Sequence, residues 1–387
     1  MRETVIVRAV RSPVGRRDGA LAGVHPVDLS ADIVNALLDR AGLDPAVVED
    51  VIWGCVGQVG DQAGNIGRNV VLAAGWPSHV PGTTIERQCG SSQQAIHFAA
   101  AVVGSGQADI VVAGGVESMS RIPMGTARRV GFGDPNSDRI KARYQGVQFH
   151  QGNSAEMLAR KYALSRQWLD EFSVESHERA ARASDTGLFD DELVPIHGPD
   201  GIILERDEGI RRGSTVEKLA TLKPAFDPEG SVTAANSSQI SDGAAAVLVM
   251  SAEKARSLGL TPLVRIRAAT IVGSDPVLML DGPIPATARA LKTAGLSLGD
   301  IGAFEVNEAF ASVVGAWLSE TGADRALVNA SGGAIAIGHP LGGSGARLAT
   351  TLVHRMVRDG IRYGLQTMCE GGGMANATIY ENPAVGS

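Results

Sequence analysis

The chain repeats one succession of elements in its two halves, and this duplication restricts the possible fold more than any other feature. Residues 36–54 read ALLDRAGLDPAVVEDVIWG, and residues 290–306 read ALKTAGLSLGDIGAFEV. Each stretch is a helix end, an Ala-Gly-Leu cap, a short polar turn and a strand. A glycine-flanked turn, a helix and a strand ending in glycines follow in both halves. This order predicts two similar α/β units, and the long period favours duplication over a solenoid.

The two helices that follow these units differ in composition. The helix at 91–103 (SSQQAIHFAAAVV) is apolar nearly all round, which predicts burial at the centre of the molecule. The helix at 344–360 (SGARLATTLVHRMVRDG) has one apolar stripe, with Arg347 and Arg355 outside it. We expect this second helix to lie on the surface with one packed face.

A different region, rich in charge, Pro and Gly, separates the halves. It holds a polar helix with Ser165 as the expected N-cap and Gly187 as the expected C-cap. After it, AAAVLVM at 244–250 has the composition of a buried strand that returns to the first half. Long excursions of this kind often carry substrate contacts. The predicted parts are a first half, residues 1–117 with about 241–265, an inserted loop domain, residues 118–240, and a second half, residues 266–387.

Composition excludes several functional classes. The net charge of −7 argues against a general nucleic-acid surface, and no apolar run approaches the roughly 18 residues of a membrane span. The cysteines are three and widely spaced, which is no disulfide framework and suits a reducing compartment. The histidines show no zinc-ligand spacing, so we expect no metal. Without a secretory or lipidation signal in the sequence, we expect a cytoplasmic protein.

Cys89 is the first candidate for chemistry. It follows the strand-like TTIER and precedes the apolar helix. Free N–H groups and the positive end of the helix dipole would favour its thiolate, and cysteines so placed can titrate below neutrality. The alternative is a small buried structural residue, which is the common fate of a free cysteine.

Three further stretches bear on that choice. Residues 329–347 hold His339 in a run of glycines before a helix, where an imidazole can take a proton from a nearby thiol. In MCEGGGMANATIYE, Cys369 ends a strand, and the N–H groups after it, that of Gly371 included, can form an oxyanion-binding nest. In EVNEAFA, Asn307 and Glu308 interrupt an apolar context, and buried polar groups need partners.

Each of these stretches also has a structural interpretation. His339 could be a loop histidine satisfied by a carbonyl, Cys369 a buried residue in a tight turn, and Asn307 a helix N-cap. Strand ends of related α/β units fall on one edge, however, where open α/β sheets bind ligands. We therefore expect Cys89, Asn307, His339 and Cys369 to converge.

At this point the sequence resembles the thiolase family, in four ordered motifs: QCGSSQQA, NEAFA, GGAIAIGHPLGGSGAR and CEGGGM. The similarity covers essentially the whole chain and includes RSPVGRRDGAL, VAGGVESMS and GSVTAANSSQISDGAAAVLVMS. The resemblance implies a duplicated five-layer αβαβα fold with an inserted loop domain, usually as a homodimer or homotetramer. It also implies reversible acyl transfer between coenzyme A thioesters, as in acetyl-CoA acetyltransferases and 3-ketoacyl-CoA thiolases.

The resemblance assigns roles to the converging residues. Cys89 would carry the acyl group, and His339 would activate it. Cys369 would move the proton at the α-carbon and at the leaving thiol. Asn307 would hold a water that forms one oxyanion site with His339, and the N–H groups of Cys89 and Gly371 would form the other.

Further residues match positions that contact coenzyme A or the acyl group. Arg211 matches an adenine contact, and Ser238 lies where the pantetheine arm would pass. His150 and Met279 match residues of short-chain, acetoacetyl-type thiolases near the acyl group. Without the resemblance, Arg211 would be taken for a solvated surface charge.

The sequence departs from the family pattern at two positions near the site. Gln151 stands where short-chain enzymes usually have Met, and Glu370 stands where an apolar residue is common. A carboxylate facing the cysteines would raise the pKa of their thiols. We expect Glu370 to point out of the pocket instead. Both changes put strict acetoacetyl-CoA specificity in doubt and favour longer or branched 3-oxoacyl-CoA.

The expected ligands are acyl-CoA and free coenzyme A as substrates and products, with no permanently bound cofactor. One alternative is a decarboxylating ketoacyl synthase of the same fold, which would call for a Cys-His-His site. The presence of Cys369 at the third position argues against it. A second alternative is a non-catalytic acyl-CoA or lipid carrier, which would be expected to lose the cysteines or His339.

Overall fold

The two halves of the chain build sheets with the same strand order. The structure is a computed structural model that describes residues 2–129, 131 and 133–386. The strands of the first half are β1 (Thr4–Arg11), β3 (Asp50–Gly54), β4 (Thr83–Ile85), β5 (Ile110–Ser118) and β8 (Ser241–Ser251). Those of the second half are β9 (Val264–Gly273), β10 (Ala303–Val306), β11 (Tyr363–Glu370) and β12 (Met374–Glu381).

The pairing of these strands confirms the predicted duplication. The first half runs β3-β5-β8-β1 and the second runs β10-β11-β12-β9. In each half the first pair is parallel and the next two are antiparallel. Strand β4 extends the first half at its edge, and β2 (Gly15–Arg16) pairs with β8. The strand predicted at 244–250 does return to the first half, because β8 lies between β1 and β5.

The two sheets meet at a single short contact. Val5 and Ile6 of β1 pair antiparallel with Arg265 and Val264 of β9, which makes one continuous ten-stranded sheet. The division of the chain at residues 117/118, 240/241 and 265/266 stays a prediction.

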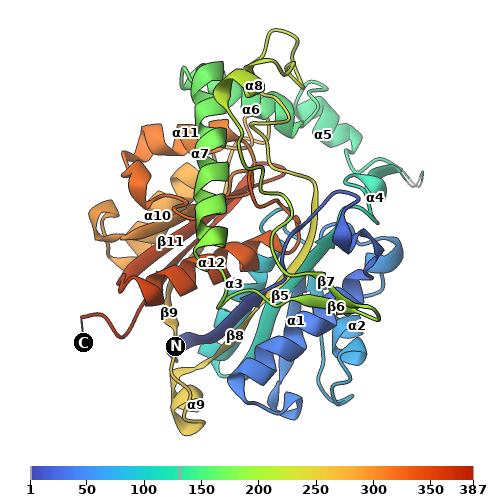
Figure 1. Ribbon diagram of the computed structural model, residues 1–387, viewed down its shortest axis with the longest axis vertical. Helices are drawn as coiled ribbons and strands as arrows, with labels where there is room; N and C mark the ends of the chain where they lie inside the picture. Colours follow the sequence, from blue (N-terminus) through green and yellow to red (C-terminus); the bar gives the residue numbers. More distant parts are fainter. Residues whose placement is uncertain (1, 130, 132, 387) are drawn as a thin grey trace.

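Helices fill three layers around this sheet. They are α1 (Pro26–Ala41), α2 (Ile66–Ala73), α3 (Ser91–Ser105), α10 (Pro283–Ala294), α11 (Ala311–Thr321) and α12 (Ser344–Arg358). One apolar core joins α1 and α2 to the first half, a second encloses α3 and α12, and a third joins α10 and α11 to the second half. The order α/β/α/β/α is the expected five-layer fold (Figure 1).

The expectation of a surface position for the helix at 344–360 is wrong. Helix α12 lies beside α3 between the halves of the sheet (Figure 1), and Arg347 and Arg355 on its polar side are buried. The buried carboxylate of Glu305 on β10 lies near both guanidinium groups. The polar face of α12 is therefore covered by protein and not by water. The burial predicted for α3 is confirmed, although Phe98 is 42% exposed.

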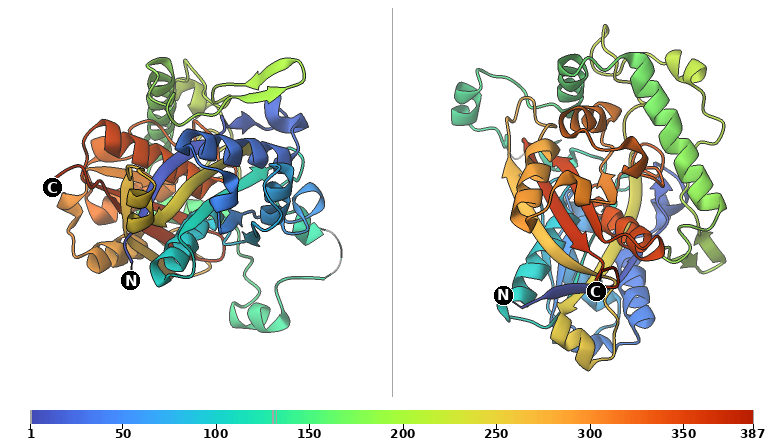
Figure 2. Two further views of the ribbon diagram at one scale, coloured as in Figure 1. Left: turned by 90° about the horizontal axis from the view of Figure 1, so that it is seen from below. Right: turned by 90° about the vertical axis from the view of Figure 1, so that its left-hand side faces the viewer.

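The connection between β5 and β8 covers one end of the molecule. It contains α4 (Thr126–Arg129), α5 (Asp138–Arg143), α6 (Gln151–Lys161), α7 (Arg166–Asp185), β6 (Ile196–Gly198), β7 (Gly201–Leu204) and α8 (Val216–Ala220). The segment with α4 and α5 projects from the body in both views of Figure 2. Ser165 is the N-cap of α7, as predicted, and its hydroxyl accepts from the N–H of Trp168 at 3.1 Å. The C-cap is Thr186, and Gly187 follows in the left-handed conformation.

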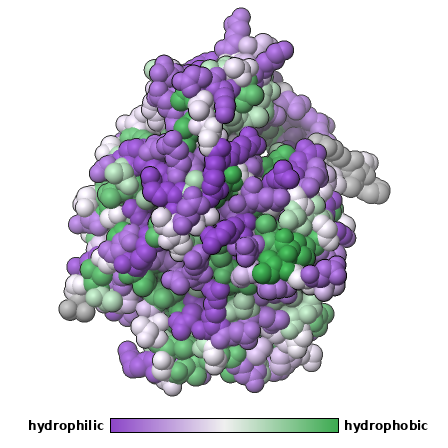
Figure 3. Space-filling model, in the orientation of Figure 1, coloured by the Kyte–Doolittle hydropathy of each residue, from purple (hydrophilic) through white to green (hydrophobic). Residues whose placement is uncertain are grey.

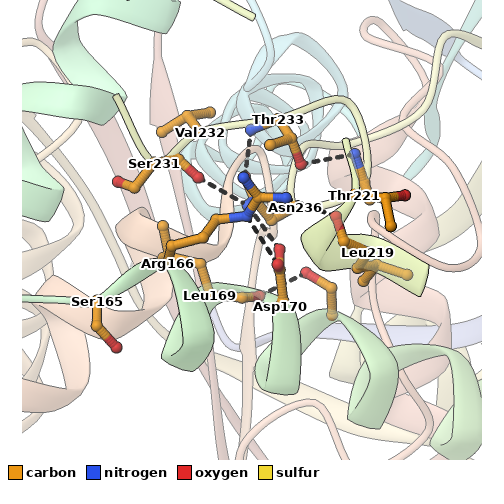
Figure 4. A network of polar contacts seen from close by, with 12 residues as sticks. Ser165, Arg166, Leu169, Asp170, Leu219, Thr221, Ser231, Val232, Thr233 and Asn236 are labelled. Carbon is orange, nitrogen blue, oxygen red and sulfur yellow. Dashed lines mark hydrogen bonds and ion pairs between the residues drawn. The ribbon is translucent and has the colours of Figure 1, made fainter. Parts of the chain in front are cut away.

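Helix α7 holds the loop that returns toward β8 (Figure 4). The Arg166 guanidinium donates to Asp170 and to the Leu219 carbonyl, and the Asn236 amide donates to the other Asp170 oxygen at 3.1 Å. Because Asp170 is buried, these charge-assisted bonds are well shielded from water. They fix the backbone two residues before Ser238.

The face seen in Figure 3 is mostly hydrophilic. One larger apolar group on it lies over the β6–β7 hairpin, where Ile202 is 56% exposed. Short α9 (Ala252–Ser257) follows β8. Within the described part of the chain, no helix combines the length and apolar character that crossing a bilayer requires.

Candidate active site

The first part of the site is made by two helix N-termini that lie side by side. The N–H of Ala346 in α12 donates to Ser92 Oγ in α3 at 2.9 Å. Gly345 packs against the backbone of Gln93, leaving no room for a Cβ. Since Cys89 lies two residues before the start of α3 and His339 lies in the loop five residues before the start of α12, this contact brings the two segments together.

The second part is made by the ends of β10 and β11. The two strands are parallel, and the N–H of Asn307 donates to the Thr367 carbonyl at 3.0 Å. Asn307 therefore lies beside the residues that lead to Cys369. Its side-chain Nδ2 is 3.4 Å from His339 Nε2. Asn307 is a buried side chain at a strand end and not a helix N-cap, because α11 begins later, after Phe310.

The two sulfurs meet between these parts. Both thiols are buried, with 3% of Cys89 and 1% of Cys369 exposed, and the charge on Cys89 raises the pKa of Cys369. The Gly371 N–H and the Gln151 side chain hydrogen-bond the Cys89 sulfur. Met279 is buried in the same apolar cluster as Cys369. The sequence had suggested that Gln151 lines the acyl wall, whereas it reaches the nucleophile candidate itself.

The hydrogen bonds of His339 fix its tautomer. Ser344 Oγ donates its only proton to the Pro340 carbonyl at 2.8 Å, so it accepts from His339 Nδ1 at 2.6 Å. Nε2 is then left without a proton and faces Asn307. Burial lowers the pKa of His339 to about 3, and the charge of Arg347 acts in the same direction. The imidazole is therefore neutral at physiological pH and can accept a proton at Nε2.

The expectation that Cys89 titrates below neutrality is wrong. Burial raises its pKa to about 12, and the negative charge of Glu370 adds to this. The N–H groups of Cys89 and Gly371 and the amide of Gln151 act in the opposite direction but do not compensate. Cys89 thus rests as a thiol, and a base must take its proton as it reacts.

Glu370 lies near both thiols even though its side chain points away from that of Cys369. Strand alternation turns its side chain to the face of β11 opposite Cys369. There, however, the carboxyl group is fully buried against Gly90, the N-cap of α3. Its charge raises the pKa of both cysteines, because buried charges are poorly screened.

Two buried glutamates hold the loops of the site. The Glu117 carboxylate accepts N–H bonds from Val56, Gly57 and Gly342 at 2.9–3.0 Å. The Glu308 carboxylate accepts from the Ser176 hydroxyl, the Asn329 side-chain amide and the Ile335 N–H at 2.7–3.2 Å. Glu117 thereby ties the His339 loop to the loop after β3, and Glu308 ties its beginning to α7. The sequence motifs contain both residues but do not indicate which backbone groups they bind.

The coenzyme A candidates lie in two places. His150, the N-cap of α6, places its ring edge-on to Phe226 with centroids 5.6 Å apart. The N–H of Ser238 donates to the Ala309 carbonyl at 2.9 Å, next to the apolar cluster of Cys369.

Arg211 lies in a separate surface pocket. The pocket encloses about 220 Å³ against α7, and no catalytic candidate lines it. The Arg211 N–H donates to His177 Nδ1 at 3.1 Å. Its guanidinium forms no ion pair with a described carboxylate, whereas Arg212 pairs with Asp185. Among the residues with described positions, no three His, Cys, Asp or Glu side chains gather as metal ligands.

Two buried thiols and a neutral imidazole at the strand ends of a duplicated five-layer fold define a class of enzymes that transfer acyl groups through sulfur. Comparison with known families gives the particular member: family models described as the thiolase N-terminal and C-terminal domains match residues 4–253 and 260–382. The chain belongs to the thiolase family and is an acyltransferase of the thiolase type.

Individual relatives agree with this placement over nearly their whole length. The chain is 51% identical to a steroid 3-ketoacyl-CoA thiolase of Mycobacterium tuberculosis, covering 98% of this chain and 94% of the relative. It is 46% identical to a 3-ketoacyl-CoA thiolase of Escherichia fergusonii, covering 98% and 100%. The crystal structure of the Bacillus anthracis acetyl-CoA acetyltransferase superposes with a TM-score of 0.91 at 39% identity, covering 99% of both chains.

Proposed function

We propose that the enzyme transfers acyl groups reversibly between 3-ketoacyl-CoA, acetyl-CoA and free coenzyme A, with Cys89 carrying the acyl group. The observation that carries this proposal is the unprotonated Nε2 of His339, which faces Asn307 at the end of β10, beside the strand that leads to the buried thiol of Cys369. A thiol with a high pKa and a neutral base beside it suit proton transfer that is concerted with attack on a thioester.

In the first half-reaction, the proton of the Cys89 thiol goes to His339 Nε2 while the sulfur attacks the thioester carbon. The negative charge that develops on the thioester oxygen falls beside the N–H groups of Cys89 and Gly371. The intermediate collapses, the C–S bond to coenzyme A breaks, and the leaving thiolate takes the proton. Cys89 is left as a neutral thioester.

In the second half-reaction, the Cys369 thiol passes its proton to His339 Nε2, and the thiolate then removes the α-proton of an acetyl-CoA. The resulting carbanion attacks the thioester carbon on Cys89, the C–S bond to Cys89 breaks, and a 3-ketoacyl-CoA forms. The Cys89 thiolate takes the proton from His339. The enolate oxygen would accept hydrogen bonds from the protonated Nε2 of His339 and from a water on Asn307, whose Oδ1 has no hydrogen-bond partner among the described residues. Thiolysis follows the same steps in reverse.

We propose an acyl range beyond acetoacetyl-CoA, within lipid or fatty acid metabolism. Gln151 replaces an apolar residue of short-chain enzymes, and its side-chain amide interacts with Cys89. Met279 and Phe310 keep the other wall of the pocket apolar. The names of the relatives, 3-ketoacyl-CoA thiolases including one for steroid substrates, support a longer or bulkier acyl group. The comparisons give no support to the non-catalytic carrier.

A series of 3-ketoacyl-CoA substrates tests this proposal. We expect purified protein to cleave medium-chain or branched substrates with a kcat/KM about tenfold or more above that for acetoacetyl-CoA. Loss of the Mg²⁺-enolate absorbance of the substrate measures the rate, and the Cys89→Ala protein serves as the blank. The highest kcat/KM on acetoacetyl-CoA would overturn the range, and no thiolysis of any member would overturn the activity.

Arg211 is proposed to contact the adenine end of coenzyme A, together with His150 and Ser238 along the pantetheine arm. We expect Arg211→Ala to raise the Kd for coenzyme A about five- to tenfold, because it removes a positive charge that pairs with no carboxylate among the described residues. Isothermal titration measures this change. Arg212→Ala is the matched control, since Arg212 lines the same pocket but pairs with Asp185. Equal Kd values for the Arg211→Ala and native proteins would remove Arg211 from the binding site.

Coenzyme A and acyl-CoA are the proposed small-molecule partners, with no permanently bound cofactor. We further propose a homodimer or homotetramer, which light scattering after size exclusion would detect. A reducing, cytoplasmic compartment is proposed from the three free thiols.

A further inference from the structure

The side chain of Glu370 is an unusual group for the floor of a thiol site. It is fully buried, and neither carboxyl oxygen has a hydrogen-bond partner among the described residues. A Cβ added to Gly90 would lie 1.9 Å from Glu370 Oε1, so the carboxyl group rests directly on the Cα of Gly90. Gly90 is the residue after Cys89, so the carboxyl group contacts the backbone beside the first sulfur. Glu370 is itself the residue after Cys369, so the same group is also close to the second sulfur.

The neighbouring Asn376 indicates which protonation state fits this position. The amide of Asn376 donates from Nδ2 to Gln94 Oε1 at 3.4 Å, and the same Nδ2 lies 3.4 Å from His97 Nδ1. The amide therefore turns its Oδ1 toward Glu370, and this oxygen lies 3.2 Å from the same Gly90 Cβ position.

Two acceptor oxygens thus lie close together, and the backbone N–H of Asn376, although near the carboxyl group, does not reach hydrogen-bond geometry with either of its oxygens. An ionised Glu370 would add a repulsion here, whereas a protonated Glu370 can donate its O–H to Asn376 Oδ1. A buried polar group without a partner costs about 1–3 kcal/mol, and an unpaired charge costs more. The geometry therefore favours the neutral acid.

The charged groups around this carboxyl come from three segments. Glu86, Arg87 and Cys89 lie in the segment before α3, and Cys369 lies on β11. His97 lies on α3 and is uncharged, because burial lowers its pKa. Burial raises the pKa of Glu370 to about 8, and the charge of Glu86 acts in the same direction, whereas the charge of Arg87 and the backbone N–H of Asn376 lower it. Arg87 forms no ion pair with Glu370, because its Nη1 points to Met374 Sδ at 3.6 Å.

We propose that Glu370 is a positioning residue that holds a proton in the resting enzyme, and that loss of this proton to solvent suppresses thiolate formation at Cys89 and Cys369. The proposal rests on the proposed function only in taking these two sulfurs as the reacting ones. With Glu370 neutral, the N-terminus of α3 stabilises charge on sulfur alone. With Glu370 ionised, the carboxylate occupies the same positive end and opposes a thiolate.

The pH dependence of thiol alkylation tests the proposal without measuring turnover. We expect Glu370→Gln and native protein to react with iodoacetamide at equal rates near pH 7, because glutamine imitates the neutral acid. Above about pH 8 the native carboxyl ionises, and the variant should react several-fold faster at both cysteines. Mass spectrometry of the Cys89 and Cys369 peptides over time gives the two rates separately.

Each outcome decides the matter. A Glu370→Gln protein that is alkylated faster than native protein only at alkaline pH supports the proposal. A variant that is alkylated faster at every pH shows that Glu370 is already ionised at rest. Identical rates at every pH show that Glu370 does not influence the thiols. Either of the last two overturns it. Failure of the enzyme assay alone would touch only the proposed function.

Glu305→Gln is the matched control. Glu305 is also buried, and burial raises its pKa to about 8, but the charges near it are Arg347, Arg355, Glu308 and Glu192. Its replacement should leave both alkylation profiles unchanged, and a shift equal to that of Glu370→Gln would overturn the proposal by showing a general effect of buried carboxylates.

A second variant covers the case in which Glu370→Gln does not fold. Arg87→Met removes the positive charge that lowers the pKa of Glu370, so Glu370 should keep its proton to higher pH. In native protein, ionised Glu370 should make the alkylation rate rise less steeply with pH above about pH 8. In Arg87→Met this change of slope should appear about one pH unit higher. A displacement to lower pH, or none, would overturn the proposal.

Discussion

Replacing Cys89 by alanine is expected to abolish acyl-enzyme formation and to reduce turnover by at least about 10³-fold, since loss of the nucleophile in a serine protease costs about 10⁶. The backbone N–H groups and His339 remain in place, but no atom is left to hold the acyl group. The fold should persist because the change removes one sulfur from a buried site without exposing a charge. Incubation with acetyl-CoA and intact-mass spectrometry measure the label, and circular dichroism checks the fold.

Cys55→Ala is the matched control for this change. Cys55 is as buried as Cys89, but it belongs to the core under α1 and α2, and burial raises the pKa of its thiol. The Cys55→Ala protein should take up one acyl group as the native protein does. An acyl label on Cys369 with none on Cys89 in the native protein would contradict the assignment.

The duplication was predictable because it is written in local patterns. Helix ends, Ala-Gly-Leu caps and strand-ending glycines recur at 36–54 and 290–306, and short-range preferences decide such features. The structure adds that both halves share the order parallel, antiparallel, antiparallel. Because strand ends of equivalent units meet at one edge, convergence of the candidate residues could also be inferred from sequence alone.

The wrong expectations concern how far a side chain is exposed to water, which a sequence does not specify. The stripe on α12 predicts a surface helix, yet Glu305 of β10 and Glu192 lie against its polar side, and Arg347 is buried. The start of α3 predicts an acidic Cys89, yet burial outweighs the helix N-terminus and raises its pKa to about 12. Each local rule is sound, but tertiary packing changes the dielectric environment in which it acts.

Some site residues gave no usable signal in the sequence. Ser344 fixes the tautomer of His339 from five positions away, with a hydroxyl that also caps the Pro340 carbonyl. For Gln151 the sequence indicated a place near the site, but not that it lies beside Cys89, which is 62 positions earlier in the chain. Contacts of this kind depend on how layers are placed, so only coordinates reveal them.

Replacing Cys369 by alanine is expected to separate the two half-reactions. The protein should still be acylated at Cys89, because His339 and the N–H groups of Cys89 and Gly371 are untouched. Condensation should fall by about 10²–10⁴-fold or more, the usual contribution of a positioned general base. Rapid-quench mass spectrometry of the acyl-enzyme, followed by acetyl-CoA addition, measures both steps, and a variant that cannot be acylated would contradict this division of roles.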